Sequence, residues 1–183
     1  RLEKYCSEKI NRGLLTGLDR VFVIDNSKKN QLEKKSINSS EIIFPYLIGK
    51  QIKRYFIDWS NTHILLIKKG ENIKKFPAIL EYLRPFKKEL ESRWDKGDWY
   101  SLRTCAFYDD FNKPKIIFAH FATRPQFTFD EKGFYVNAKA YILPINDKYL
   151  LGILNSKVIA FFSKSICPFV RGKYYEFNKQ YVN

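Results

Sequence analysis

Apolar residues in the second half of the chain either alternate with polar ones or form short continuous runs, as they do in strands with one or two buried faces. Three segments have this pattern, at residues 115–121, 126–130 and 134–144. The sequence Asp-Glu-Lys-Gly at 130–133 separates the last two and favours a hairpin turn. We therefore expect three strands in this part of the chain, two of them joined by that turn.

Helical periodicity is clearest between Pro77 and Trp94, where apolar residues recur three or four positions apart. The first turn of a helix tolerates proline, so Pro77 favours a helix start. Pro85 lies inside the same pattern. It should kink or split the helix, because proline lacks an N–H group and crowds the preceding turn.

Capping residues indicate three further helices. They are residues 41–49, capped by Ser39 and Ser40 and ended by Gly49; residues 148–156, capped by Asp147 or Asn146; and residues 157–166, begun by Asn155 or Ser156. The remaining first half predicts a buried strand at 21–25, a polar loop at 30–40, and adjacent strands at 50–59 and 63–68 with Asn61 in the turn between them.

Strands and helices that follow one another without a regular rhythm are typical of an α+β fold. We expect mixed, largely antiparallel sheets with several packed helices in a single domain, residues 1–183, because a chain of this length buries one sizeable core. The chain begins at Arg1 and contains no Met, which indicates a fragment of a longer polypeptide.

No run of residues approaches the length of apolar sequence that a membrane span requires, and no signal peptide opens the chain. The three cysteines, Cys6, Cys105 and Cys167, are scattered and form no C-x-x-C pair, so neither a disulfide framework nor a zinc site is indicated. We expect a soluble, cytoplasmic protein without contact to a membrane.

Positive charge is the strongest feature of the composition: 33 Lys and Arg stand against 19 Asp and Glu, a net charge of +14. Such an excess favours a polyanionic partner. Three windows contain cations and no acid, and their cations are Lys50, Lys53 and Arg54; Lys113, Lys115 and Arg124; and Lys148, Lys157, Lys164, Arg171 and Lys173. The alternatives are a charge that serves solubility alone and a positive face that docks an acidic protein partner.

Catalytic motifs are sparse. His63 and His120 lie in predicted strands without a nucleophile motif beside them and are interpreted as structural. No glycine-rich phosphate loop occurs, and there is no Pro-Pro of the kind that holds a flipped adenine in amino-methyltransferases. One enzymatic alternative stays open, a Mg²⁺-dependent nuclease that uses Asp110, Asp130 and Lys132. The competing interpretation is that residues 130–133 are turn residues with their side chains in solvent.

Aromatic residues are unusually frequent, with 16 Phe, 12 Tyr and 3 Trp. Most of them belong in the core. A subset adjoins polar or charged loop positions and could contact sugars or bases, or mark the ordinary boundary between core and solvent: Tyr55, Trp59, Trp99, Tyr100, Tyr174 and Tyr175. Residues 166–177, Ile-Cys-Pro-Phe-Val-Arg-Gly-Lys-Tyr-Tyr-Glu-Phe, combine two cations, a glycine and two tyrosines and are expected to form a loop.

Five segments occur in an order that resembles the TaqI-like C-terminal specificity domain of adenine-N6 DNA methyltransferases and single-chain restriction-modification enzymes. They are residues 10–25, 42–59, 76–93, 111–144 and 149–182, the last of which contains Arg-Gly-Lys-Tyr-Tyr at 171–175. The resemblance implies a DNA target-recognition module that partners a methyltransferase domain of the same chain on double-stranded DNA. It implies no catalytic residue, cofactor or metal in this fragment, with S-adenosylmethionine and possibly Mg²⁺ used by the parent enzyme.

The resemblance and the charges together select the residues expected to contact DNA. Gly172 allows close approach of the backbone, while Arg171 and Lys173 can reach a phosphate or a guanine edge. The full set is Arg171, Gly172, Lys173, Tyr174, Lys50, Lys53, Arg124, Thr16 and Gly17. Lys50 and Lys53 are assigned to the DNA backbone, since lysine is a point charge without the planar fork of arginine. The alternatives are an intradomain salt bridge for Arg124 and a simple turn for Thr16 and Gly17.

Overall fold

The computed structural model describes residues 2–6, 10–93, 97–170 and 172–182. The chain divides into two compact units. Unit 1 comprises Arg1–Gly13, Leu47–Ser60 and Phe107–Asn183, and unit 2 comprises Leu14–Tyr46 and Asn61–Ala106. Both units combine helices with mostly antiparallel strands, so the prediction of an α+β fold is confirmed. Within the described residues, no helix has both the length and the apolarity needed to cross a membrane.

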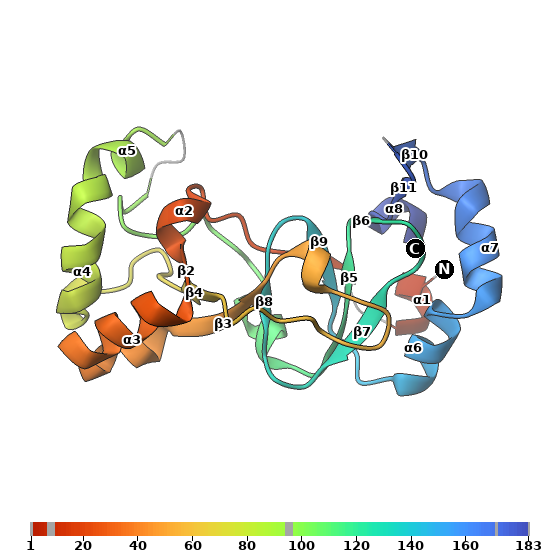
Figure 1. The fold of residues 1–183 in the computed structure, drawn as a ribbon, viewed down its shortest axis with the longest axis horizontal. Helices are drawn as coiled ribbons and strands as arrows, with labels where there is room; N and C mark the ends of the chain where they lie inside the picture. Colours follow the sequence, from red (N-terminus) through yellow and green to blue (C-terminus); the bar gives the residue numbers. More distant parts are fainter. Residues whose placement is uncertain (1, 7–9, 94–96, 171, 183) are drawn as a thin grey trace. The chain divides into compact units, whose positions relative to one another are not determined.

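Unit 1 is built around two antiparallel sheets (Figure 1). The first has the strand order β1 (Asn11–Arg12), β9 (Ala140–Leu143), β5 (Lys115–Ala119) and β7 (Phe127–Asp130). The second has the order β10 (Phe169–Val170), β11 (Tyr174–Glu176) and β6 (Phe121–Ala122). The other elements of the unit are the short strand β8 (Tyr135–Val136), the 3₁₀ helices Gly49–Gln51 and Tyr108–Asn112, and the helices α1 (Leu2–Cys6), α6 (Lys148–Leu154), α7 (Lys157–Ile166) and α8 (Lys179–Val182).

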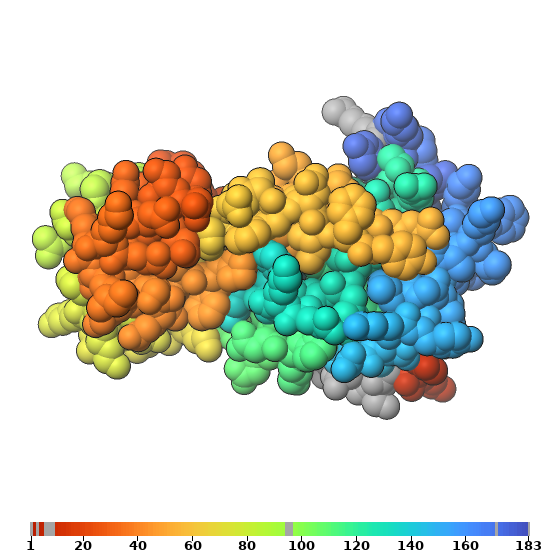
Figure 2. All heavy atoms as spheres, turned by 60° about the horizontal axis from the view of Figure 1, so that its bottom comes forward, coloured from red at the N-terminus to blue at the C-terminus, as the bar shows by residue number. Residues whose placement is uncertain are grey.

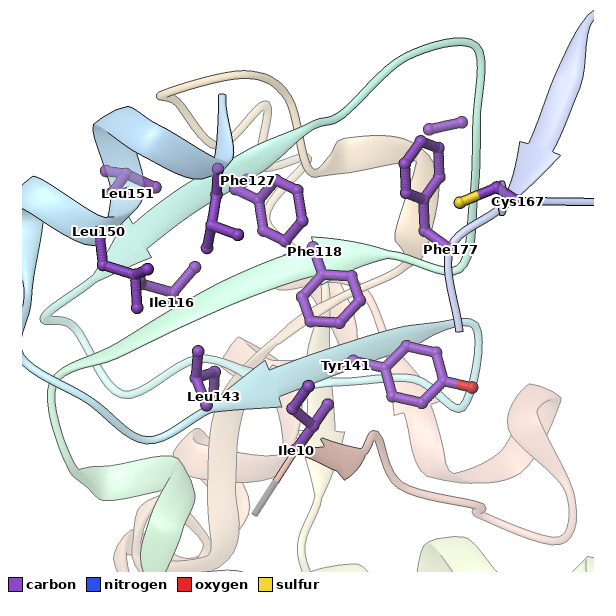
Figure 3. Close-up of a cluster of buried hydrophobic side chains, with 12 residues drawn as sticks. Ile10, Ile116, Phe118, Phe127, Tyr141, Leu143, Leu150, Leu151, Cys167 and Phe177 are labelled. Carbon is purple, nitrogen blue, oxygen red and sulfur yellow. The ribbon is translucent and has the colours of Figure 1, made fainter. Parts of the chain in front are cut away.

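The core of unit 1 joins the first sheet to α6 (Figure 3). Ile116 and Phe118 lie two positions apart on β5 and therefore point to the same face, where Leu150 and Leu151 of α6 join the cluster. Burying side chains of this size stabilises the fold by about 1.5–3 kcal/mol each. Both helix caps were predicted correctly: the side chain of Asp147 accepts a hydrogen bond from the N–H of Leu150, and that of Ser156 accepts one from the N–H of Ile159.

Unit 2 has an antiparallel arrangement of β2 (Val23–Ile24), β4 (His63–Leu65) and β3 (Ile43–Leu47). Its helices are α2 (Asp19–Phe22), α3 (Asn26–Lys35), α4 (Pro77–Leu83) and α5 (Lys87–Glu91), with 3₁₀ helices at Ile37–Ile42, Ile73–Lys75 and Arg84–Phe86. Pro77 opens α4 and Pro85 lies in the 3₁₀ turn that separates α4 from α5, as predicted. Asn61, with φ +55°, occupies the predicted turn before β4.

Four predictions in the first half were wrong. Residues 41–49 contain the strand β3 and not a helix, because Pro45 would break a helix at its fifth residue whereas its register opposite His63 is tolerated. Residues 30–40 are largely helical: Asp25 caps α3, and a Lys29–Glu33 ion pair of 3.1 Å spans one turn of it. Leu32 is the one buried residue of α3, so this helix has no apolar periodicity.

The segments 21–25 and 50–59 also differ from the predicted strands. Val21 and Phe22 are buried as expected, but they belong to α2, and only Val23 and Ile24 form a strand. Residues 50–59 fold back on themselves through an isolated pairing of Ile52 with Ile57. The sequence pattern does not reveal this fold, because Tyr55 and Phe56 have the strand-forming aromatic side chains of a core position and are nevertheless exposed.

The turn at 130–133 exists, but it is not a hairpin turn. The carboxylate of Asp130 accepts hydrogen bonds from the N–H groups of Lys132 (2.8 Å) and Phe134 (2.9 Å), and Gly133 has φ +75°. The strand before the turn, β7, pairs with β5 and not with β8, which follows the turn. The turn therefore sends the chain away from the first sheet.

Candidate nucleic-acid interface

The segment expected to be a loop, residues 166–177, is a β-hairpin that begins after α7. Phe169 pairs with Tyr175 and Val170 with Tyr174, which leaves the turn between β10 and β11. Gly172 has φ +78°, a conformation that glycine adopts without strain. Lys173 and Tyr174 are exposed. Arg171 lies outside the described residues, so its predicted contact with DNA stays a prediction.

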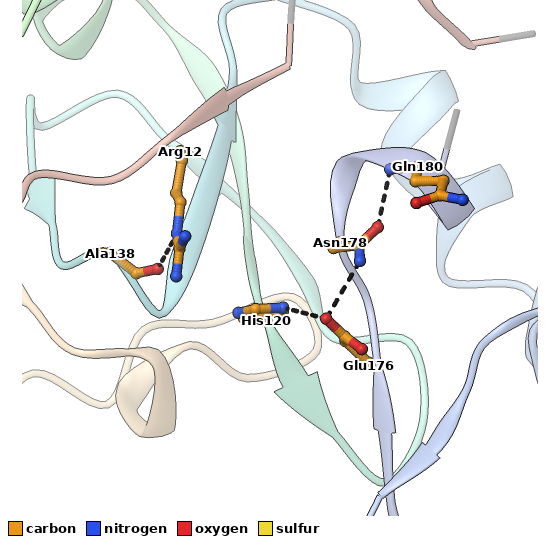
Figure 4. A network of polar contacts seen from close by, with 6 residues as sticks. All are labelled: Arg12, His120, Ala138, Glu176, Asn178 and Gln180. Atoms are coloured by element: carbon orange, nitrogen blue, oxygen red, sulfur yellow. Dashed lines mark hydrogen bonds and ion pairs between the residues drawn. The ribbon is translucent and has the colours of Figure 1, made fainter.

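The hairpin is attached to the rest of unit 1 through β6 and one polar network (Figure 4). Nε2 of His120 lies 2.9 Å from Oε1 of Glu176, and the side-chain amide of Asn178 donates to the same oxygen at 3.1 Å. The N–H of Phe177 donates to the carbonyl of His120 at 2.7 Å. The hydrogen bond from His120, followed by that from Asn178, lowers the pKa of Glu176 below its usual value. His120 therefore has the structural role predicted for it, as the anchor of the hairpin.

A second exposed turn comes from the segment 50–59. Lys50 is exposed and Lys53 is half-buried. Between Ile52 and Ile57 the chain turns through Arg54 and Tyr55, and Tyr55 has φ +71°. In Figure 2 this segment is amber and lies against the teal and blue surface of the same unit. Two hydrogen bonds hold it there: Tyr55 N–H to the carbonyl of Phe127 (3.0 Å), and Nη2 of Arg54 to the carbonyl of Asn155 (2.9 Å).

Arg124 lies in the connection between β6 and β7 and is exposed. Among the residues that the structure describes, Arg124, Lys50 and Lys173 have no carboxylate within ion-pair distance. The alternative of an intradomain salt bridge for Arg124 therefore finds no partner in the described part of the chain. A cation without an internal partner is available to an external anion.

Thr16 and Gly17 belong to unit 2 and form a tight turn. Thr16 is 2% exposed, and its hydroxyl is hydrogen-bonded to the carboxylate of Asp19. Gly17 has φ +81°, and a β-carbon there would come 2.9 Å from the guanidinium of Arg93. That guanidinium donates to the carbonyl of Thr16 at 3.2 Å. These contacts support the alternative of a structural turn, and the predicted DNA contacts of both residues stay predictions.

The two carboxylates of the nuclease alternative are engaged elsewhere. Glu131 and Lys132 are exposed, as expected for turn residues, but Asp130 is 1% exposed, which corrects that expectation for this residue. Its carboxylate lies 2.5 Å from Nζ of Lys115, which is itself fully buried. Asp110 accepts hydrogen bonds from Asn11 (2.9 Å) and Lys113 (2.8 Å). In the described ranges, no three His, Cys, Asp or Glu residues are grouped so that they could hold a metal ion.

Lys115 was counted among the cations available to phosphates, and this was wrong. It is the first residue of β5, all five residues of which are buried, and it faces Asp130 across the antiparallel register. Burial lowers the pKa of Lys115, and Asp130 opposes that shift. The pair therefore belongs to the interior of the sheet and not to the interface.

Comparison with known proteins gives a consistent picture. The family model of the TaqI-like C-terminal specificity domain matches residues 44–183. The Type II methyltransferase M.BstVI of Geobacillus stearothermophilus is 23% identical over 95% of this chain and 32% of its own length. M.BanIII of Aneurinibacillus aneurinilyticus, also a Type II methyltransferase, is 24% identical over 85% of this chain and 30% of its own length.

Among solved structures, the Type IIL restriction-modification enzyme MmeI in complex with DNA matches with a TM-score of 0.72 and 12% identity. The match covers 96% of this chain and 24% of that protein, and at this identity it shows a common fold. The chain thus spans about a third or less of the length of each of these proteins.

Proposed function

Because the chain belongs to the TaqI-like C-terminal specificity domain family, we propose that it binds double-stranded DNA and selects the target of a methyltransferase domain in the same polypeptide. The chain itself carries out no catalysis in this proposal. S-adenosylmethionine, and Mg²⁺ where the parent enzyme also cleaves DNA, would be bound by other domains. The proposed location is the cytoplasm, where the DNA is.

The observation that carries this proposal is the group of surface cations in unit 1 that, among the described residues, have no carboxylate partner. Unit 1 contains 18 Lys and Arg against 9 Asp and Glu. Several of those acids are already engaged: Asp130 by Lys115, Glu176 by His120, and Asp147 by the N-terminus of α6. The cations that remain for phosphate contacts include Lys50, Lys53, Arg124 and Lys173. Phosphate contacts supply most of the affinity and orient a protein on the duplex.

Different roles are proposed for the two cations of the β10–β11 turn. Lys173 is a flexible point charge suited to a phosphate, whereas the planar guanidinium of Arg171 can form two hydrogen bonds with a guanine edge. The exposed ring of Tyr174, beside them at the start of β11, can contact a sugar or a thymine methyl group.

Fluorescence anisotropy with a labelled duplex tests this function. The chain should bind at low salt, and its affinity should fall steeply as salt increases, because each neutralised phosphate releases counterions. Lys173→Ala should weaken binding to all sequences and make the salt slope shallower by about one unit. Arg171→Ala in the full-length enzyme should cost about 1–3 kcal/mol on the target site and relax one position of the recognised sequence.

Lys35→Ala is the matched control, because Lys35 in unit 2 is exposed but paired with Glu81 at 3.3 Å. It should leave the salt slope nearly unchanged. No binding at low salt, or binding whose affinity does not depend on salt, contradicts the proposal.

Incubation with plasmid and Mg²⁺ tests the nuclease alternative, and nicking that disappears in Asp130→Asn would support it. Binding to polyglutamate in preference to DNA would support the acidic protein partner.

A further inference from the structure

A cleft of about 420 Å³ lies in unit 1 beside the turn that carries Tyr55. One wall is formed by Tyr55, Phe56, Ile57 and Trp59, and the other by the end of β7 and the turn after it. Five of its ten lining residues are aromatic: Tyr55, Phe56, Trp59, Phe129 and Phe134. Its volume falls in the range of about 300–1,000 Å³ that is typical of sites for small ligands.

The backbone of the first wall is strained. A left-handed conformation is unfavourable for a residue with a β-carbon, and Tyr55 adopts it with φ +71°. The hydrogen bonds of Tyr55 to Phe127 and of Arg54 to Asn155 keep it in this conformation. A glycine here would remove the strain and preserve both bonds. The backbone conformation therefore does not require a side chain at this position. The ring contacts Arg54, and its exposed half requires another explanation.

The rings on this wall are also exposed. Tyr55 is 51% and Phe56 is 60% exposed, although each is large and apolar. The guanidinium of Arg54 lies 5.0 Å from the centre of the Tyr55 ring and contacts it as a cation–π pair. Two adjacent exposed rings, one of them oriented by a cation, form a surface on which a flat aromatic ligand can stack.

The opposite wall is rigid. Phe134 of this wall packs edge to face against Trp59 of the first wall, with the ring centres 5.3 Å apart. The N–H groups of Lys132 and Phe134 are held by the buried carboxylate of Asp130, which is paired in turn with Lys115. The position of this wall is thus fixed by the interior of the sheet.

Positive charge predominates around the cleft. Lys53 and Arg54 belong to the turn, which also carries the exposed Asp58, and Lys132 lines the opposite wall. The one exposed acid of the lining, Glu131, is paired with Lys148 at 3.0 Å, and Nζ of Lys148 lies 5.1 Å from the centre of the Phe129 ring. Aromatic rings for stacking together with cations for phosphate are the combination that binds unpaired nucleotides.

We propose that this cleft binds a nucleobase displaced from the DNA stack. The base stacks on the rings of Tyr55 and Phe56, and the backbone phosphates on either side of its nucleotide face Lys53, Arg54 and Lys132. This inference rests on the proposed function, because the duplex must first be bound. It adds a base-binding site to the phosphate contacts of that function and assigns a role to the strained turn.

The test compares two duplexes of the same sequence, one of which carries a single unpaired 2-aminopurine as a bulge. Stacking contributes about 1–3 kcal/mol per base, so the chain should bind the bulged duplex at least about fivefold more tightly. The emission of 2-aminopurine should fall on binding as the base stacks on protein rings. Tyr55→Ala and Phe56→Ala should lose both effects while their affinity for the unbulged duplex changes little.

Two control variants distinguish the loss of the Tyr55 ring from a general effect of substitution on the fold. Tyr55→Phe keeps the ring and should retain the preference for the bulge. Tyr149→Ala removes a ring that is 77% exposed on α6 and does not line the cleft, so it should behave as the unsubstituted chain.

Each alternative result has a definite meaning. Binding to both duplexes with equal affinity, unchanged by Tyr55→Ala, overturns the base site and leaves the proposed function intact. An equal loss on both duplexes in Tyr55→Ala and Phe56→Ala also overturns it, since the rings would then contact ordinary duplex. Absence of binding to either duplex contradicts the proposed function itself.

Discussion

Unit 1 has two exposed turns that contain the same types of side chain but differ in backbone conformation. Each contains a cation, a tyrosine and a residue in the left-handed conformation, with Arg54 and Tyr55 in one turn and Lys173 and Tyr174 in the other. In the β10–β11 turn the left-handed residue is Gly172, for which the conformation is free of strain. In the other turn the tyrosine itself adopts it. Glycine is sufficient where the turn only has to hold the neighbouring side chains in solvent. The presence of a tyrosine at the left-handed position of the other turn therefore indicates that its ring has a function of its own.

The two turns also differ in what anchors them. The Tyr55 turn is hydrogen-bonded to Phe127 and Asn155, both buried, and faces a wall fixed by the buried Lys115–Asp130 pair. The Gly172 turn is anchored through Glu176, whose side chain is 28% exposed. We expect the surroundings of the first turn to be rigid and independent of pH, and those of the second to respond to acid.

The largest effect should come from Lys115→Met. Removal of one partner of a buried ion pair leaves an unpaired buried charge, here Asp130, and typically costs 3–5 kcal/mol, so we expect a loss of about that size. Urea denaturation measures it. Lys148→Met is the control: it breaks the exposed pair with Glu131, where the side chains are 65% and 60% exposed, and should cost less than about 1 kcal/mol. Equal losses in the two variants would contradict the rigid wall.

Asn155→Ala should have the next largest effect. The side-chain amide of Asn155 donates to the carbonyl of Phe127 at 2.9 Å, and its oxygen accepts from the N–H of Phe127 at 3.1 Å. Leaving buried polar groups without partners costs about 1–3 kcal/mol. Thermal denaturation measures the loss, and amide exchange of Tyr55 should become faster. The control Asn178→Ala affects the other anchor, which is half-buried, and should cost less. Unchanged exchange at Tyr55 would show that Asn155 does not hold the turn.

Local signals in the sequence predicted much of this fold. Pro77, Asp147 and Ser156 begin helices where expected, because a helix start depends on side chains next to it in the chain. The strands β5, β7 and β9 follow from their apolar runs. The cations of the proposed interface were chosen from the family resemblance and from charge, and Lys50, Arg124 and Lys173 are indeed exposed.

What could not be predicted depends on tertiary contacts. The left-handed conformation of Tyr55 has no glycine or asparagine to indicate it and arises from bonds to Phe127 and Asn155. The burial of Asp130 follows from a register that places it opposite Lys115. A lysine that begins one strand and an aspartate that ends its antiparallel neighbour would have been a usable signal, had the pairing of these strands been considered.

Glu176→Gln tests the acid response of the second anchor. The pKa of Glu176 is lowered in the folded chain, so its ionised form stabilises the fold above the ordinary pKa, and this contribution is lost as pH falls through the lowered value. The variant should be less stable than the parent by about 1 kcal/mol at neutral pH, and this difference should disappear as pH falls through the lowered pKa of Glu176. Denaturation across this pH range measures the difference. A difference that does not change with pH would assign the role of Glu176 to packing and not to its charge.

The smallest changes in stability should come from two substitutions at the left-handed positions of the turns, one that removes a glycine and one that introduces a glycine. The two changes should have opposite signs. Gly172→Ala should destabilise the chain by about 1 kcal/mol, because alanine is strained at φ +78°; the β-carbon itself meets nothing closer than 4.0 Å, so no clash contributes. Tyr55→Gly should stabilise it by about 0.5–1 kcal/mol, since the relief of strain exceeds the entropy that glycine adds to the unfolded chain. The same variant should lose the preference for a bulged duplex. Urea denaturation and anisotropy on one preparation measure both properties. If Tyr55→Gly is more stable than the parent and no longer prefers the bulged duplex, the ring of Tyr55 serves ligand binding. A loss of stability in Tyr55→Gly would show instead that the ring is part of the fold.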